Sequence, residues 1–185
     1  MNKEVAANIG MRGRVFVATY QWKGDFESSL ACEPDETRAA HNILCDTGLT
    51  VLANAVMWSS VEDQNANMGS PFTAMYAAPI YGAIGTGTTT PTGHDSALTS
   101  GEVRAIVTGA GYAAAYFPTP ALFSWLFLFG VPPVGITIAE CGVYFQATST
   151  VGSGSLFNHA LISPTITQST TQIFTLNISV SIGNH

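Results

Sequence analysis

Charged side chains are scarce in this sequence of 185 residues, and their scarcity limits what the chain can bind. Only 10% of the residues are Asp, Glu, Lys or Arg, whereas about 25% is usual in soluble domains. Six Lys and Arg against twelve Asp and Glu give a net charge of −6. Phosphate contacts need clustered cations, so this balance argues against a nucleic-acid partner. So few charges protect a monomer poorly against association. We therefore expect a subunit whose surface is largely covered by its partners.

The second half of the chain is almost free of charge. Arg104 is the last cation, and Glu140 is the only Asp, Glu, Lys or Arg after it. The uncharged run over residues 119–139 is long enough to span a bilayer. Several Pro and Gly residues interrupt it, however, and no Lys or Arg flanks it closely, so we expect no membrane span. Residues 1–18 carry charges where a signal peptide needs an apolar run, which predicts synthesis in a cytoplasm.

Cysteine is also rare, and its arrangement excludes the common cysteine-based sites. Cys32, Cys45 and Cys141 have no metal-ligand spacing and are odd in number. Without an export signal, we interpret all three as reduced thiols. Cys45 and Cys141 lie in apolar stretches, and we expect both to pack as small hydrophobic residues.

What the sequence does contain is a series of strand-like segments, which predicts an all-β fold. Segments rich in β-branched and aromatic residues recur between turns rich in Gly, Pro, Ser and Thr. This pattern is typical of a β-sandwich or a jelly-roll-like domain. In the last segment apolar residues alternate with polar ones, and only Phe174 interrupts the alternation. The predicted strands are 14–20, 42–46, 75–84, 106–116, 122–129, 136–145, 155–162 and 172–182.

One short helix is predicted near residues 48–58, with Thr47 as its N-cap. The highly charged segment 22–40 is expected to be an exposed loop or hairpin tip. A weak boundary near residue 41 divides an N-terminal strand and charged loop (1–40), interpreted as an assembly arm, from a β-sandwich domain (41–185). The alternative is one continuous domain over residues 12–185.

No motif predicts catalysis, a cofactor or a metal. The Gly- and Thr-rich segment 85–94 lacks the Lys and the following helix of a phosphate-binding loop. His94 and Asp95 are adjacent but have no nucleophile signature, and we expect Asp95 to bond within its own turn. His41, His94, His159 and His185 lack a second metal ligand at close spacing. The loop carboxylates lack calcium-loop spacing: Asp46, Asp63 and Asp95.

Glu140 is a carboxylate in an apolar strand, which is costly unless it is paired or hydrogen-bonded. Arg104 is the only cation in the strand-rich second half, so we predict a structural ion pair between Arg104 and Glu140. The alternative, that Glu140 accepts backbone N–H groups of a neighbouring loop, stays open. Apart from Asp95, Glu102 and Glu140 are the only acids in this half, so they are the only candidates there for a glycosidase-like carboxylate pair.

The uncharged, aromatic-rich run 117–135 is predicted to contribute to a subunit interface. We therefore expect the purified protein to be an oligomer. The candidate interface residues are Phe117, Leu122, Phe123, Trp125, Phe127 and Phe129.

An ordered set of segments resembles a family of small structural proteins of tailed bacteriophages, of the tail-fibre-like or minor tail type. The resemblance begins at Arg12–Val15 and continues through Asn42–Leu49, Ile84–Leu98, Glu102–Arg104, Glu140–Tyr144 and Leu156–Pro164. It implies a β-sandwich located in the virion, and it implies neither a cofactor nor catalytic residues.

We therefore expect a non-enzymatic virion subunit of the tail apparatus (fibre, tip or baseplate), made in the host cytoplasm. It would pack against copies of itself, preferably as a trimer, and against other virion proteins. One alternative is a neck or capsid decoration protein. Another is a receptor- or carbohydrate-binding module at a fibre tip, where Trp22, Trp58 or Trp125 would contact a host-surface glycan.

Overall fold

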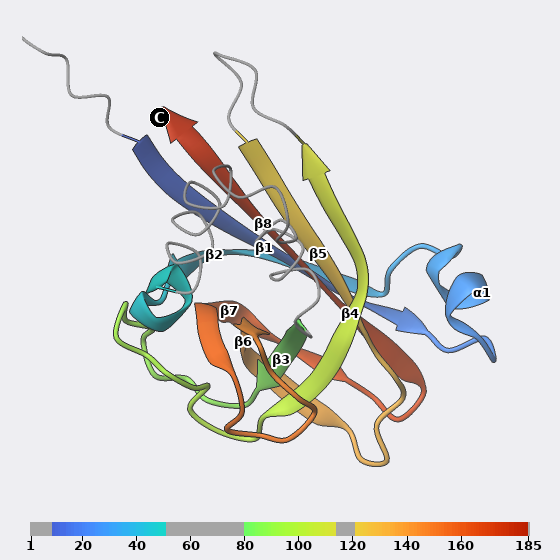
Figure 1. Cartoon of the computed structure of the whole chain (residues 1–185). Helices are drawn as coiled ribbons and strands as arrows, with labels where there is room; N and C mark the ends of the chain where they lie inside the picture. The colour runs from blue at the N-terminus through green and yellow to red at the C-terminus, as the bar shows by residue number, and fades with distance from the viewer. Residues whose placement is uncertain (1–8, 51–79, 114–120, 185) are drawn as a thin grey trace, which may run out of the picture.

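The computed structural model describes residues 9–50, 80–113 and 121–184. Within these residues, eight antiparallel strands pair in a closed barrel in the order β1-β2-β7-β6-β3-β4-β5-β8 (Figure 1). A short helix, α1 (Phe26–Leu30), follows the first strand. The strands are β1 (Ile9–Gln21), β2 (Glu36–Leu44), β3 (Tyr81–Gly85), β4 (Val103–Ala113), β5 (Ala121–Phe129), β6 (Ile136–Phe145), β7 (Ser155–Gln168) and β8 (Gln172–Asn184).

Two strands close the barrel because each of them pairs with different neighbours along its length. In β4, residues 103–106 pair with β3 and residues 107–113 pair with β5. In β2, residues 36–42 pair with β1 and residues 43–44 pair with β7. Strands β3, β4 and β5 are consecutive and β6 returns beside β3, which is a Greek-key order. The all-β prediction is confirmed; the strands form a closed ring, not specifically a sandwich or jelly roll.

Alternate residues of each strand fill the barrel interior, as the pleat requires. In β8 the interior residues are Phe174, Leu176, Ile178 and Val180. The alternation predicted for this strand therefore needs a correction, because Phe174 belongs to the interior set and Ile173 lies on the opposite face of the strand.

The charged segment 22–40 is more ordered than the predicted loop. Asp25 caps α1, and its Oδ1 accepts a hydrogen bond from the Ser28 backbone N–H at 2.7 Å. Strand β2 begins at Glu36, and its residues alternate between half-buried and exposed. Its polar residues therefore fit a strand with one solvent-exposed face. The charged composition of this segment wrongly predicted a loop at these positions. Residue 41, where we place a weak boundary, lies within β2.

The predicted helix near residues 48–58 is described only at its start. Residues 46–50 are helical, and the remaining predicted positions lie outside the described residues, as do residues 75–79 of the predicted strand. Thr47 is not the N-cap, because it lies within the first helical turn. Its hydroxyl instead donates to the Leu156 carbonyl oxygen at 2.8 Å.

The predicted subunit interface needs a correction in β5. Trp125, Phe127 and Phe129 are buried in the barrel interior, because every second residue of this strand faces inward. These three side chains form the core of one subunit. Phe117, and the side chains of Leu122 and Phe123, lie outside what the structure describes. No helix among the described residues is long and apolar enough to cross a membrane.

Candidate functional site

The loop over residues 86–101 covers the outer face of β3, β6 and β7 and connects two strands of the barrel. Leu98 packs from this loop into a small second core with Ala83, Tyr144 and Leu156. The loop is also tied at its base, where the Thr86 N–H donates to the Ser100 carbonyl oxygen at 2.9 Å. We call this segment the 86–101 loop.

Glu140 faces this loop because β6 is irregular. Ile138 and Cys141 both lie in the interior core although they are three residues apart, which a regular strand does not allow. The pairing of β6 with β7 shifts between Ile138 and Glu140. This β-bulge reverses the alternation and places Glu140 on the outer face, on the same side as Tyr144.

The Glu140 carboxylate is fully buried and accepts hydrogen bonds from the 86–101 loop. Its Oε1 accepts from the backbone N–H groups of Gly87 (3.0 Å), Thr99 (2.9 Å) and Ser100 (3.0 Å). Its Oε2 accepts from the Thr99 hydroxyl at 2.5 Å. The alternative in which Glu140 accepts loop N–H groups is thus the observed one.

His159 of β7 connects this carboxylate to a second one. Its Nε2 lies 2.9 Å from Oε2 of Glu140, and its Nδ1 lies 2.7 Å from Oδ2 of Asp95 in the 86–101 loop. His159 therefore bridges the two carboxylates, and each of its ring nitrogens has a carboxylate oxygen as its partner.

Both carboxylates stay ionised in this cluster. Burial alone would raise the pKa of Glu140, but the hydrogen bonds from Thr99, Ser100 and His159 outweigh it and hold the pKa below its usual range. Burial likewise opposes ionisation of Asp95. The N–H and hydroxyl of Thr92, together with His159, outweigh it and lower that pKa as well. The cluster attaches the 86–101 loop to the barrel.

Arg104 belongs to a separate network, so the predicted Arg104–Glu140 pair is wrong. The Arg104 side chain is buried and forms its ion pair with Glu102. Its guanidinium also lies over the Tyr144 ring, 4.0 Å from the centroid. The physical reason is register: Arg104 is opposite Ala83 of β3, whereas Glu140 is opposite Gly85.

The adjacent residues His94 and Asp95 do not act together. His94 is exposed, and its Nδ1 lies 2.6 Å from Oδ2 of Asp46. Oδ2 of Asp95 accepts from the Thr92 N–H at 2.9 Å, as we predicted for a turn, and the same oxygen lies beside Nδ1 of His159. Asp63 lies outside the described residues. Among residues 9–50, 80–113 and 121–184, no group of His, Cys, Asp and Glu is arranged to hold a metal ion.

This geometry holds the loop against the barrel. His159 is 1% exposed, and a carboxylate oxygen lies within hydrogen-bond distance of each of its ring nitrogens. Sequence reasoning missed His159 because its two partners are 19 and 64 residues away. Cys45 and Cys141 are buried, as predicted.

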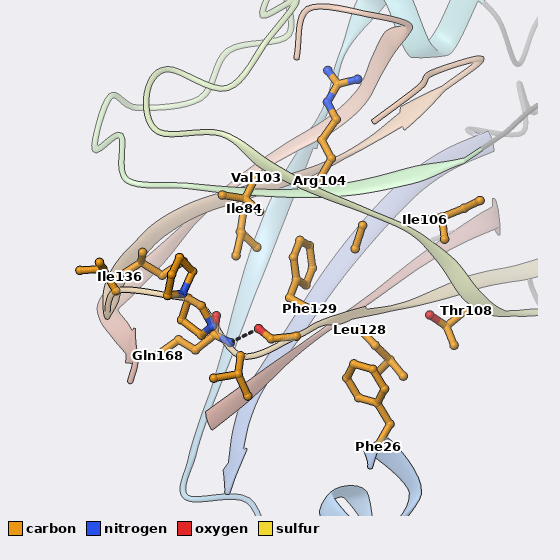
Figure 2. Close-up of a pocket in the computed structure, with 16 residues that line it drawn as sticks. Phe26, Ile84, Val103, Arg104, Ile106, Thr108, Leu128, Phe129, Ile136 and Gln168 are labelled. Atoms are coloured by element: carbon orange, nitrogen blue, oxygen red, sulfur yellow. Dashed lines mark hydrogen bonds between the residues drawn. The ribbon is translucent and has the colours of Figure 1, made fainter. Parts of the chain in front are cut away.

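A second feature, an apolar groove, opens where β4 leaves β5. The first residue of β4 to pair with β5 is Val107, opposite Phe127, so the start of β4 and the end of β5 diverge. The groove between them has a volume of about 680 Å³. Helix α1 and the turn between β5 and β6 (residues 130–135) complete its walls (Figure 2). Its main apolar lining residues are Phe26, Val103, Ile106, Leu128, Val131 and Val134.

Comparisons with protein-family models, with curated proteins and with solved structures found no match for this chain. The contacts and charges of its own residues are therefore the basis for the proposal that follows.

Proposed function

We propose that this protein is a non-enzymatic structural subunit of a bacteriophage virion, acting in the tail apparatus through contacts with copies of itself and with other virion proteins. The observation that carries the proposal is the absence of exposed Asp, Glu, Lys or Arg side chains after Arg104. Glu140 is the only Asp, Glu, Lys or Arg side chain after Arg104, and it is fully buried.

A surface without charge favours association over solubility as a free monomer. Strands β5, β6, β7 and β8 all lie in this part of the chain. Large hydrophobic side chains are exposed there as well, among them Val131, Val134 and Val151. Partner surfaces that cover these side chains would remove apolar area from water. The sequence resemblance to tail-fibre-like and minor tail proteins supports a location in the virion.

The buried charges support a structural role in a different way. Asp95, Glu140 and His159 satisfy one another, and Glu102, Arg104 and Tyr144 form the second network. Enzymes instead direct titratable groups into an accessible pocket. In the described chain the large groove is lined by apolar side chains, and the charged group of Arg104 points away from it (Figure 2).

The test is to locate the chain in particles. Phage particles from the host that carries the gene are purified, separated into heads and tails, and quantified by mass spectrometry. We expect the protein at a fixed copy number in the tail fraction. Its absence from intact particles would overturn the proposal. In parallel, particles that carry His94→Ala and Asp95→Ala and assemble normally should release no fewer reducing ends from host envelope polysaccharide than wild-type particles.

Trp22 supports a second candidate, a receptor-binding module at a fibre tip. Its side chain is 38% exposed and packs edge-on against Phe26, with ring centroids 5.5 Å apart. An exposed aromatic pair of this kind is suited to stacking on a sugar. Trp125 is excluded because it lies in the core, and Trp58 lies outside the described residues. Quenching of Trp22 fluorescence by host glycans, lost in Trp22→Ala, would favour this candidate.

A further inference from the structure

We propose that the apolar groove is a contact site between copies of this chain, and that it receives the 130–135 turn of a second copy. The inference deepens the proposed function and rests on it for the expectation that copies of the chain meet. It names the surface and the occupant, which the proposed function leaves open.

The first argument is that exposed apolar side chains gather at this groove. Val103 and Ile106 project from β4 on one side, and Val131 and Val134 project from the turn on the other. Four of the eight large hydrophobic residues that are markedly exposed in the described chain therefore line a single depression. A fifth, Trp22, adjoins it through Phe26. The volume of the groove falls within the range of about 300–1,000 Å³ that is typical of sites that bury most of a ligand.

The second argument is electrostatic, and it selects a copy of this chain over a charged or polar partner. Among the described residues, Arg104 is the only charged one that lines the groove. Its guanidinium is held elsewhere by Glu102 and by the carbonyl oxygens of Thr148 and Ser153. Two copies with a net charge of −6 each repel one another at long range. They approach best through a face that carries no free charge, and both the groove and the turn are such faces.

The third argument is shape, because the turn is a projecting apolar segment held in a fixed position. Val134 is 71% exposed at its tip, and Val131 and two prolines accompany it. Buried Gln168 anchors the start of the turn: its Nε2 donates to the Gly130 carbonyl oxygen at 2.8 Å and to that of Gln172 at 2.9 Å. A rigid apolar projection beside an apolar depression is self-complementary. Such a contact closes as a reciprocal pair or as a ring of copies, and the expected trimer is the ring of three.

The experiment measures self-association of the full chain by sedimentation equilibrium. We expect a concentration-dependent oligomer for the wild type. Val134→Asp should weaken association roughly thirty-fold or more, the effect of removing a central interface residue. Val151→Asp is the matched control, because Val151 is 58% exposed and does not line the groove. This control should associate like the wild type. Both variants should unfold at the same temperature as the wild type at concentrations where all three are monomeric.

A cross-link then identifies the contact itself. In a Cys32→Ser background, one preparation carries Val134→Cys and a second carries Ile106→Cys. Mixing the two under mild oxidation should give a disulfide between unlike chains, since each chain has one exposed thiol. Mixing Val151→Cys with Ile106→Cys should give no such product.

Three outcomes would overturn the inference. One is a wild-type chain that stays monomeric at all accessible concentrations. Another is an oligomer that Val134→Asp leaves intact. The last is a small apolar molecule that native mass spectrometry finds bound to the wild type and absent from Val134→Asp. The second and third outcomes leave the proposed function standing. Its own failure is recorded separately, as the absence of the chain from virions.

Discussion

Replacing Glu140 by Gln changes the charge of the buried cluster while keeping its shape. The Gln side chain can keep its oxygen at the Oε1 position, where three loop N–H groups donate. Its NH₂ group then takes the position of Oε2. There it meets the Nε2 hydrogen of His159 and the hydroxyl of Thr99, which both donate in the wild type.

The magnitude follows from the contacts that are lost. A hydrogen bond to a charged group contributes about 1.5–3 kcal/mol, and Glu140→Gln places a neutral NH₂ group where the charged Oε2 faces the Thr99 hydroxyl and the His159 ring. Removing one partner of a buried ion pair costs about 3–5 kcal/mol. We therefore expect Glu140→Gln to lower the free energy of unfolding by about 3–5 kcal/mol, a large part of the roughly 5–15 kcal/mol of a typical domain.

The assay is urea unfolding as a function of pH. The folded-state pKa of Glu140 lies below its ordinary value of 4.5, so its ionised form stabilises the native state at pH above 4.5. This stabilisation is lost as the pH falls through the lower, folded-state pKa. The difference in stability between the wild type and Glu140→Gln should therefore be full at neutral pH and should narrow below pH 4.5.

Two results would refute this reasoning. The first is a loss below about 1 kcal/mol at pH 7, no larger than that expected for Glu36→Gln. Glu36 is the matched control because its ion pair with Arg38 is partly exposed, and such pairs contribute little. The second is additivity: if Glu140→Gln and His159→Gln sum to the effect of the double variant, the two side chains are not coupled.

Two further predictions concern packing in the barrel and thiol reactivity. Gly82→Ala should destabilise the fold by about 1–3 kcal/mol in urea unfolding, because a Cβ there would lie 2.4 Å from the Phe127 ring; a neutral effect would show that the interior can yield. At pH 8, a thiol reagent should label Cys32 quickly, and Cys45 and Cys141 only after denaturation. The reason is that burial raises the pKa of Cys45 to about 12 and also raises the pKa of Cys141. Fast labelling of more than one thiol in the native protein would contradict this prediction.

The strands that sequence reasoning placed well are those with a continuous apolar character between strong turns. The predicted segment 136–145 has the same bounds as β6, because Pro and Gly precede it and a polar turn follows it. The predicted strand 42–46 omits the first residues of β2, because residues 36–41 are mostly charged or small. A half-exposed strand tolerates such residues. Closure of the barrel depends on the long-range pairings of β2 and β4, which local patterns do not encode.

The site shows the same division between local and long-range information. The need of Glu140 for partners was predictable from its apolar surroundings, but the identity of those partners depends on register. Arg104 was assigned to it because no other cation is near in sequence. The signal for the actual pair was present, since Glu102 and Arg104 are two residues apart and side chains at that spacing share one face of a strand. The irregularity after Ile138 left no such signal.

That irregularity has a consequence for how the sequence can change over time. Because the alternation of β6 reverses between Ile138 and Cys141, the length of the strand matters as much as its composition. Deleting Ala139 would leave Ile138 facing inward, Glu140 outward and Cys141 inward, which is the alternation of a regular strand. A one-residue deletion between Glu140 and Phe145 would instead reverse the faces on one side of the deletion. Gaps in an alignment of descendants should therefore fall at the irregularity and avoid the rest of β6.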